Sequence, residues 1–207
     1  MGALPLSSII YYTDKLKRGL KNFMKSLIFL KEYITKPRTV GAVLPSSKYL
    51  ADKMVANIDF DRARCIVEYG PGTGVFTDKI LKLRRADTVL ILIENNAEFY
   101  GQLKNKYRAE ANLSIINDSA EHVCKYLPEY GAADYIVSGL PFASLPPEVS
   151  SNILQETQKC LKHGGKFITF QYTLLKRDFI GGYFRDIEIK RELRNVPPAY
   201  VLSCSNP

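Results

Sequence analysis

The stretch VEYGPGTGVFT, residues 67–77, places three glycines at every second position directly after an apolar run that contains an acid. Gly70, Gly72 and Gly74 have no Cβ atoms, so the backbone of such a turn can approach a ligand closely. A strand, a glycine-rich turn and a helix together present main-chain amide donors to that ligand. The sequence therefore predicts a nucleotide site, with Glu68 as the acid beside it.

The glycine spacing differs from the G-x-G-x-x-G of a dinucleotide site. A pyrophosphate needs positive surroundings, so the carboxylate of Glu68 argues against one. The acid suits a ligand that carries an ammonium and a sulfonium but no phosphate. The pattern E-x-G-x-G-x-G after a buried strand resembles the first motif of the class I S-adenosylmethionine-dependent methyltransferases. This resemblance implies S-adenosyl-L-methionine as the cofactor and S-adenosyl-L-homocysteine as the product.

Two more acids follow the next two apolar runs. Glu94 ends LILIE, twenty residues past Gly74, and Asp118 follows LSIIN. By the resemblance, Glu94 accepts hydrogen bonds from both ribose hydroxyls and Asp118 pairs with the adenine amine. The alternative is a plain tight turn with two surface acids, or Asp118 as a helix cap. The predicted cofactor-binding residues are Gly41, Val43, Glu68, Tyr69, Gly70, Pro71, Gly72, Thr73, Gly74, Glu94, Asn95, Asp118, Ser119, Ala120, Ser138 and Gly139.

The segment SGLPFASLPPE follows the fourth apolar run. In methyltransferases that act on adenine or other planar amines, this position carries Asn or Asp, then Pro-Pro or Leu-Pro and an aromatic residue. Here Gly139 replaces the amide, which weakens a nucleic-acid acceptor. We expect Phe142 to contact the transferred methyl group, because an aromatic face attracts a developing ammonium. A simple wall of the cofactor pocket is the alternative role.

Over most of residues 38–205 the chain resembles the soluble bacterial phospholipid N-methyltransferases, distant relatives of the rRNA adenine dimethyltransferases. The matching segments are TVGAVLPSS, VEYGPGTGVFT, SGLPFASLP, HGGKFITFQYT and RNVPPAYV. The resemblance implies methyl transfer to the ethanolamine headgroup of a phospholipid, phosphatidylethanolamine, at a membrane surface. An rRNA adenine dimethyltransferase, a small-molecule amine methyltransferase and a non-catalytic cofactor-binding protein stay open as alternatives.

Methylation of an alkyl ammonium first requires loss of a proton, which for a pKa near ~10.4 costs roughly 4 to 5 kcal/mol at neutral pH. The candidate bases by position are Glu148, Tyr200 and Tyr172. The cations that are candidates for a lipid phosphate are Arg194, Lys176 and Arg177. For each of these residues the alternative is a structural or solvated side chain.

Short apolar runs alternate with helical stretches, which predicts a mostly parallel sheet covered on both faces, in a Rossmann-like α/β fold. The predicted strands are residues 65–70, 88–94, 113–117, 134–139 and 166–172. The predicted helices are residues 46–57, 76–84, 97–108, 119–127 and 147–161. Alternation in residues 186–194 and 199–204, joined by two prolines, predicts a C-terminal antiparallel hairpin.

Residues 12–35 place apolar side chains at steps of three and four with lysines opposite, which predicts an amphipathic helix that ends at Pro37. Such a helix suits the headgroup region of an anionic bilayer, or packs its stripe on the domain. We therefore divide the chain into a basic arm, residues 1–37, and a methyltransferase domain, residues 38–207.

The composition is that of a globular protein: 46% of the 207 residues are hydrophobic and 24% are charged. The formal net charge of +8 gathers near the start of the chain and indicates an anionic partner, phospholipid or nucleic acid. The four cysteines have neither zinc nor disulfide-framework spacing. With no spanning segment or signal peptide evident, we expect a cytoplasmic, peripherally membrane-associated protein.

Overall fold

The computed structural model describes residues 47–127, 131–195 and 197–207. The predicted arm, and most of the TVGAVLPSS loop with Gly41 and Val43, lie outside these residues. The described residues all fall within one compact unit. In the described ranges no helix combines the length and apolar character needed to cross a bilayer.

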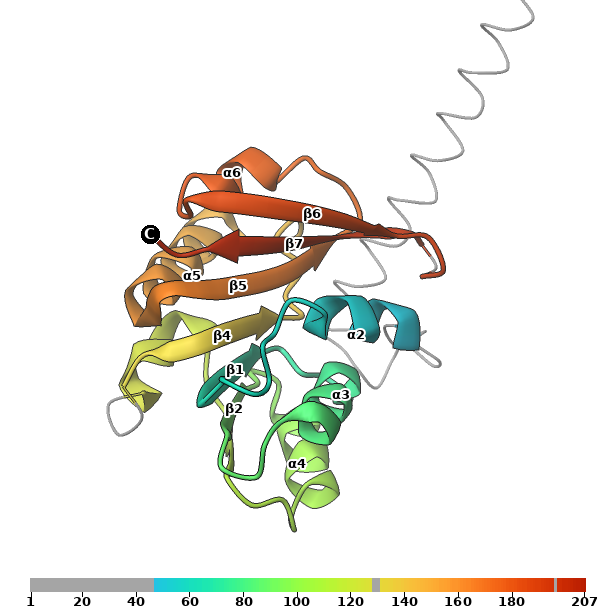
Figure 1. Ribbon diagram of the computed structural model, residues 1–207, viewed down its shortest axis with the longest axis vertical. Helices are drawn as coiled ribbons and strands as arrows, with labels where there is room; N and C mark the ends of the chain where they lie inside the picture. Colours follow the sequence, from blue (N-terminus) through green and yellow to red (C-terminus); the bar gives the residue numbers. More distant parts are fainter. Residues whose placement is uncertain (1–46, 128–130, 196) are drawn as a thin grey trace, which may run out of the picture. The chain divides into compact units, whose positions relative to one another are not determined.

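The described residues form a seven-stranded sheet in the order β3-β2-β1-β4-β5-β7-β6 (Figure 1). Its strands are β1 (Cys65–Tyr69), β2 (Val89–Ile93), β3 (Leu113–Ile116), β4 (Ala133–Ser138), β5 (Leu161–Gln171), β6 (Asp186–Glu192) and β7 (Ala199–Ser205). The first five strands are parallel, and β7 runs antiparallel to both of its neighbours. The predicted Rossmann-like fold with a C-terminal antiparallel hairpin is confirmed.

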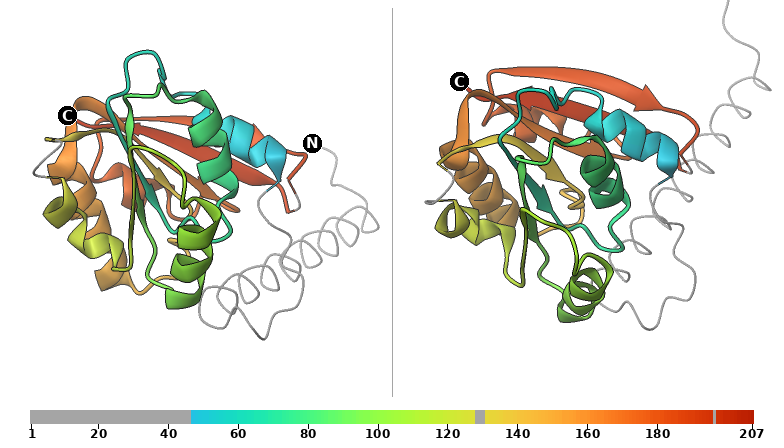
Figure 2. Two further views of the ribbon diagram at one scale, coloured as in Figure 1. Left: turned by 90° about the horizontal axis from the view of Figure 1, so that it is seen from below. Right: turned by 60° about the horizontal axis from the view of Figure 1, so that its bottom comes forward.

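Helices cover both faces of this sheet (Figure 2). They are α2 (Lys48–Val55), α3 (Val75–Leu83), α4 (Ala97–Lys106), the 3₁₀ helix η1 (Ala120–Tyr126), α5 (Pro147–Cys160) and α6 (Arg177–Gly181). The sequence did not predict α6, because five residues are too few to display helical periodicity. The predicted helix at residues 119–127 forms as a 3₁₀ helix.

Alternate residues of each strand supply the two halves of the core. In β1, Val67 and Tyr69 belong to the cluster beneath η1, α5 and α6, and Ile66 belongs to the cluster beneath α2, α3 and α4. Every residue of β1 is buried, which explains why the strand is apolar along most of its length rather than alternating. The same continuous burial encloses Glu68, the one charged residue of β1.

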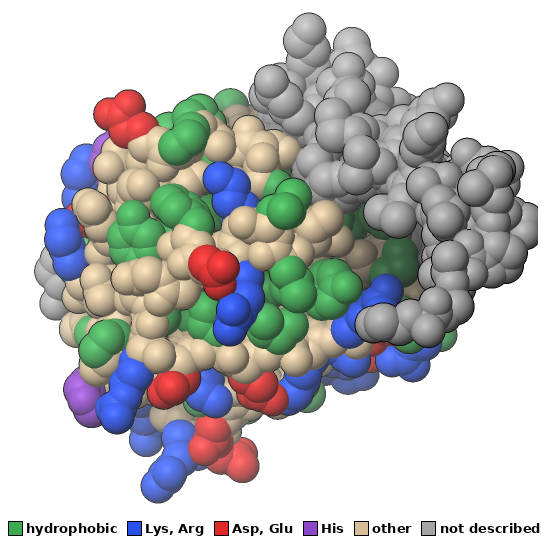
Figure 3. Space-filling model, turned by 90° about the horizontal axis from the view of Figure 1, so that it is seen from above, with side chains coloured by type: hydrophobic (Ala, Val, Ile, Leu, Met, Phe, Trp, Pro, Cys, Tyr) green, Lys and Arg blue, Asp and Glu red, His purple; other side chains and the backbone are tan. Residues whose placement is uncertain are grey.

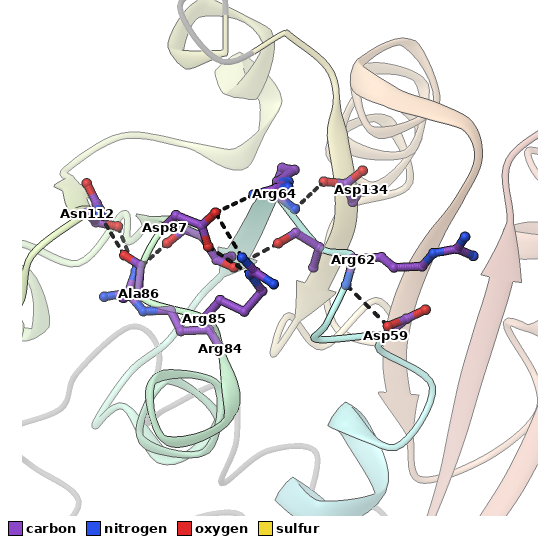
Figure 4. A network of polar contacts seen from close by, with 11 residues as sticks. Asp59, Arg62, Arg64, Arg84, Arg85, Ala86, Asp87, Asn112 and Asp134 are labelled. Atoms are coloured by element: carbon purple, nitrogen blue, oxygen red, sulfur yellow. Dashed lines mark hydrogen bonds and ion pairs between the residues drawn. The ribbon is translucent and has the colours of Figure 1, made fainter.

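A polar network ties the amino-terminal edge of the sheet together (Figure 4). The Asp134 carboxylate of β4 accepts main-chain N–H bonds from Arg64 (2.8 Å) and Cys65 (2.9 Å) and a bond from Lys162 Nζ (2.6 Å). Burial alone would raise the pKa of Asp134, but these donors lower it overall. Arg64 also pairs with Asp87 before β2. These contacts assign the amino edge a structural role, and the glycine turn lies at the opposite, carboxyl edge.

Candidate active site

The glycine turn joins β1 to α3 in a conformation that other residues rarely adopt. The φ angles of Gly70, Gly72 and Gly74 are 58°, 56° and 85°. A Cβ atom on Gly70 would lie 2.8 Å from Leu140 Cδ2, and one on Gly74 would overlap the Tyr107 hydroxyl. The turn is therefore restricted to glycine both by its backbone and by its neighbours.

Residues at the end of α4 hold this turn. The Tyr107 hydroxyl lies 3.0 Å from the Gly74 carbonyl oxygen and 2.7 Å from the Asp78 carboxylate in the first turn of α3. Lys106 Nζ donates to Asp78 (2.7 Å) and lies 3.1 Å from the Thr73 carbonyl oxygen. No local sequence pattern predicts this contact, because α4 and the turn meet only in the folded chain.

Glu68 lies in the core behind the turn. Its Oε2 accepts a bond from the Thr77 hydroxyl at 2.7 Å, and its buried Oε1 has no hydrogen-bond partner among the described residues. Burial raises the pKa of Glu68 to about 8, although the Thr77 bond acts in the opposite direction. A cation beside Oε1 would give this oxygen a hydrogen-bond donor and would favour the ionised carboxylate. The ammonium of the predicted cofactor is such a cation.

Glu94 follows β2 and reaches the glycine turn. Its Oε2 accepts the main-chain N–H of Gly72 at 3.1 Å, and its Oε1 accepts that of Asn96 at 2.8 Å. Burial raises the pKa of Glu94, and these two amide bonds oppose the shift. Each oxygen keeps a second lone pair, so the carboxylate can still accept two ribose hydroxyls. Asn95, the next residue, is exposed.

Asp118 follows β3 at the same edge. Its carboxylate accepts bonds from the Tyr126 hydroxyl (2.6 Å) and the Ser119 main-chain N–H (2.7 Å), and His122 Nδ1 lies 2.9 Å from it. These contacts, led by Tyr126, hold the pKa of Asp118 well below its usual range. Ser119, rather than Asp118, caps η1, and Ala120 is buried at the start of that helix.

The end of β4 closes onto the turn. The Gly139 N–H donates to the Tyr69 carbonyl oxygen at 2.8 Å, and a Cβ atom on Gly139 would lie 2.7 Å from the Gly70 carbonyl oxygen. Ser138 is buried and its hydroxyl accepts the Leu140 N–H at 3.2 Å. A side chain at position 139 is therefore excluded unless the turn moves.

The remaining predicted cofactor residues contribute mainly backbone to the turn. The Tyr69 side chain points away from it, with its hydroxyl 3.1 Å from Thr157 Oγ1 of α5. Pro71 is buried within the turn and Thr73 is exposed at its tip. No contact with a ligand tests these assignments, so the cofactor roles of individual residues stay predictions.

The predicted catalytic residues differ in burial and lie in different parts of the fold. Phe142 is fully buried, edge-to-face with Phe167 at 6.0 Å between ring centroids. Tyr200 of β7 lies opposite Gln171 of β5 at the carboxyl edge, with the Arg191 guanidinium 5.4 Å from its ring centroid. Glu148 is exposed in the first turn of α5. Their catalytic roles stay predictions, as does that of half-buried Tyr172, whose pKa is raised by burial.

Gln171 is a candidate that sequence reasoning missed. It ends β5 and is only 4% exposed, yet its Nε2 has no hydrogen-bond partner among the described residues. Thr169, two residues earlier on the same face of β5, has an equally unpaired hydroxyl. Unpaired buried donors are costly, so this pair marks a place where a ligand could supply the missing bonds. In the sequence the strand is a mainly apolar run, so its two polar side chains did not stand out as a candidate site.

Comparison with known proteins places this arrangement in a family. The sequence model described as "Ribosomal RNA adenine dimethylase" matches residues 44–173, well over half of the chain. The chain belongs to the ribosomal RNA adenine dimethylase family. Its matched span contains the glycine turn, Glu94, Asp118 and Gly139, so the residues gathered at the carboxyl edge are those of this family's domain.

Two relatives of this chain are named for different methyl acceptors, a lipid and ribosomal RNA. An ornithine lipid N-methyltransferase of Singulisphaera acidiphila is 29% identical over 181 residues, which cover 86% of this chain and 94% of that protein. Ribosomal RNA small subunit methyltransferase A of a Hydrogenobaculum species is 30% identical over 89 residues, 42% of this chain and 33% of that protein.

A solved structure supports the fold. The N-methyltransferase NodS of Bradyrhizobium japonicum, in complex with S-adenosyl-l-homocysteine, superposes with a TM-score of 0.59 at 12% identity, over 77% of this chain and 85% of that one. This dimethylase-family chain is a class I methyltransferase that uses S-adenosylmethionine as its cofactor. The buried Oε1 of Glu68 and the glycine cradle fit that cofactor. The reaction supported at this level is S-adenosylmethionine-dependent N-methyl transfer.

Proposed function

We propose that this protein methylates the primary amine of a membrane-lipid headgroup, with phosphatidylethanolamine as the expected acceptor. Ornithine lipid carries the same aliphatic amine chemistry and is the second acceptor to test. Support comes from the ornithine lipid N-methyltransferase relative, whose similarity extends over 94% of its length. We further propose that the reaction takes place on the cytoplasmic membrane surface, with the basic arm as one contact to anionic lipid.

The observation that carries this proposal is the contact between Gly139 and Gly70. The amine of adenine shares its lone pair with the aromatic ring. A polar side chain at position 139 could accept a hydrogen bond from this amine and help to localise the lone pair on the nitrogen. A Cβ atom at that position would lie 2.7 Å from the Gly70 carbonyl oxygen, so the turn leaves no room for one. An aliphatic amine needs no such side chain, because its lone pair is localised as soon as the nitrogen is neutral.

The residues of the chain have three tasks in this reaction. The glycine turn, Glu68 and Glu94 bind and orient the cofactor at the carboxyl ends of β1 and β2. Bound S-adenosylmethionine would supply a sulfonium methyl group for transfer to the neutral amine nitrogen, with S-adenosylhomocysteine as the leaving group. On the acceptor side, Gln171 offers an amide donor. Tyr200 is a candidate to receive the ammonium proton, once its hydroxyl has passed its own proton to solvent.

The deciding experiment uses the full-length protein and cofactor labelled in its methyl group. Vesicles contain anionic lipid with phosphatidylethanolamine, ornithine lipid or phosphatidylcholine, and separate reactions contain free ethanolamine or precursor rRNA. We expect label in extracted phosphatidylethanolamine or ornithine lipid. Phosphatidylcholine is the internal control, because its quaternary nitrogen has no lone pair. Absence of label from both amine lipids, from a protein that binds the cofactor, would refute the proposal.

Glu94→Gln is the matched loss-of-function variant, because it keeps the side-chain size and removes the carboxylate that faces the turn. We expect cofactor affinity to fall at least about tenfold, which corresponds to about 1.4 kcal/mol. Lipid labelling at subsaturating cofactor should fall with it. Unchanged labelling would exclude Glu94 from the cofactor site.

Methylation of rRNA adenine is the second candidate, favoured by the family match and by the rRNA methyltransferase relative. Label in precursor rRNA with none in lipid would establish it. Label in free ethanolamine alone would instead support a small-molecule amine methyltransferase.

A further inference from the structure

Two loops at the carboxyl edge expose leucines to solvent. Among the described residues, four large hydrophobic side chains are exposed, and three of them lie in these loops: Leu174 (41%), Leu175 (82%) and Leu193 (63%). The fourth, Leu83 (41%), ends α3. A single exposed leucine needs no explanation, but several at one edge of a sheet indicate an interaction surface.

The strand register places both loops at the same edge. Leu174 and Leu175 follow the end of β5, and Leu193 follows the end of β6. Gln171 of β5 pairs with Tyr200 of β7, and Glu192 of β6 pairs with Ala199, so both strands end beside the start of β7. This is also the edge at which the glycine turn follows β1. We name Leu174, Leu175 and Leu193 the leucine edge.

Cations accompany the leucine edge. Lys176 and Arg177 follow Leu175, and exposed Arg191 and Arg194 flank Leu193. Two nearby acids offset part of this charge: Asp178 pairs with Arg177 at 3.0 Å, and buried Glu192 pairs with Arg194 at 3.0 Å and with Lys53 at 3.4 Å. The cations Lys176, Arg177, Arg191, Arg194 and Lys53 thus outnumber the acids that pair with them, Asp178 and Glu192. Figure 3 looks onto the side that carries α6 and β6, where hydrophobic side chains lie beside Lys and Arg.

Arg194 is held in a fixed position within this surface. Its guanidinium bonds to both carboxylate oxygens of Glu192, at 3.0 and 3.2 Å, and lies 4.1 Å from the ring centroid of Tyr49 in α2. A preorganised guanidinium loses little freedom when it binds a phosphate. A fixed cation beside an exposed leucine matches the boundary between the phosphates and acyl chains of a bilayer.

We propose that the leucine edge inserts into the headgroup boundary of an anionic bilayer while its cations meet lipid phosphates. This inference rests on the proposed lipid acceptor and adds a membrane contact separate from the basic arm. It turns the carboxyl edge toward the membrane, so an amine headgroup reaches the cofactor while its acyl chains stay in the bilayer. Interfacial binding grows with buried apolar area and with attraction to anionic lipid.

The chain contains no tryptophan, which permits a site-specific test. Leu175→Trp and Leu193→Trp each place one fluorophore on the leucine edge, and Leu83→Trp places one at the other exposed leucine. With vesicles of phosphatidylcholine and phosphatidylglycerol, we expect a blue shift of the emission and quenching by brominated acyl chains at positions 175 and 193. We expect neither at position 83.

A triple variant tests the contribution to binding. Leu174→Ser, Leu175→Ser and Leu193→Ser together should lower sedimentation with the same vesicles at least about tenfold, and Leu83→Ser should leave it unchanged. Cofactor titration by calorimetry checks that the variants are folded. Added salt should weaken the binding of the unsubstituted protein.

Three results would overturn the inference. The first is vesicle binding without a blue shift at positions 175 and 193. The second is emission that is already blue-shifted without vesicles, which would mean that the arm or a second copy of the chain covers the leucines. The third is no vesicle binding at all. Failure of the proposed function is distinct from these, since it appears as unlabelled amine lipid whether or not the leucine edge inserts.

Discussion

Tyr107 and Gly74 stand 33 residues apart in the chain, and the Tyr107 hydroxyl lies 3.0 Å from the Gly74 carbonyl oxygen. A Cβ atom at position 74 would overlap that hydroxyl. The cofactor turn is thus shaped by the end of α4 as well as by its own glycines.

Gly74→Ala should damage the turn twice, through a φ of 85° and through the overlap with Tyr107. We expect a loss of about 1 to 3 kcal/mol in the free energy of unfolding and a cofactor affinity at least about tenfold weaker. Chemical denaturation and calorimetric titration measure the two. Gly101→Ala is the control, because its Cβ would meet no atom within 4 Å inside α4 and should stabilise the helix by about 0.5 to 1 kcal/mol. Equal behaviour of both variants would contradict this account.

Glu68 should make the stability of the cofactor-free protein depend on pH. Its pKa is about 8 in the fold and about 4.3 in an unfolded chain. Between these values the unfolded chain has lost the proton that the folded chain keeps, so stability falls as pH rises through this window. Glu68→Gln has no such proton. As pH rises from 5 to 8, its free energy of unfolding should therefore increase relative to that of the unsubstituted protein. Parallel denaturation curves across this range would show that Glu68 keeps an ordinary pKa.

Cofactor binding should release a proton near pH 7 if the cofactor ammonium lies beside Glu68, because a cation favours the ionised carboxylate. Calorimetric titration in two buffers of different ionisation enthalpy measures that proton. Glu68→Gln should bind the cofactor more weakly and release fewer protons. An unchanged proton count in this variant would remove Glu68 from the ammonium site.

Gly139→Asn should not convert the protein into an adenine methyltransferase. The new side chain would meet the Gly70 carbonyl oxygen, and the turn would have to shift to admit it. We expect cofactor affinity at least about tenfold weaker and no labelling of rRNA. A variant that kept full cofactor affinity and gained RNA labelling would show that the turn can shift to admit a side chain at position 139. The close approach of Gly139 to Gly70 would then no longer argue for an aliphatic amine acceptor.

Gln171→Leu should separate acceptor binding from stability. Removing an unpaired buried amide should leave the free energy of unfolding unchanged or raise it by up to about 1 to 3 kcal/mol. The KM for lipid should rise several-fold with an unchanged cofactor affinity. Gln158→Leu is the matched control, because Gln158 Nε2 donates to the Tyr183 carbonyl oxygen at 2.8 Å and its loss should destabilise the fold. An unaltered KM would assign Gln171 to packing alone.

The sequence by itself determined the glycine turn, the order of strands and helices, and the acids that follow β2 and β3. These features are local: Gly70, Gly72 and Gly74 allow the turn without reference to the rest of the chain, and a continuous apolar run marks a strand buried on both faces. Parallel strands bring their carboxyl ends to one edge, so the meeting of Glu94 with Gly72 was also predictable.

Only the tertiary structure decided which side chains find partners and which stay exposed. Tyr107 reaches Gly74 because the end of α4 lies beside Asp78 at the start of α3. Gly139 lies close to Gly70 because β4 pairs with β1. Within the described part of the chain, Glu68 and Gln171 keep polar atoms without hydrogen-bond partners, and Leu175 stays exposed to solvent, because of what surrounds each in the fold. Hydrogen bonding and burial depend on residues far apart in the chain, and no local pattern encodes them.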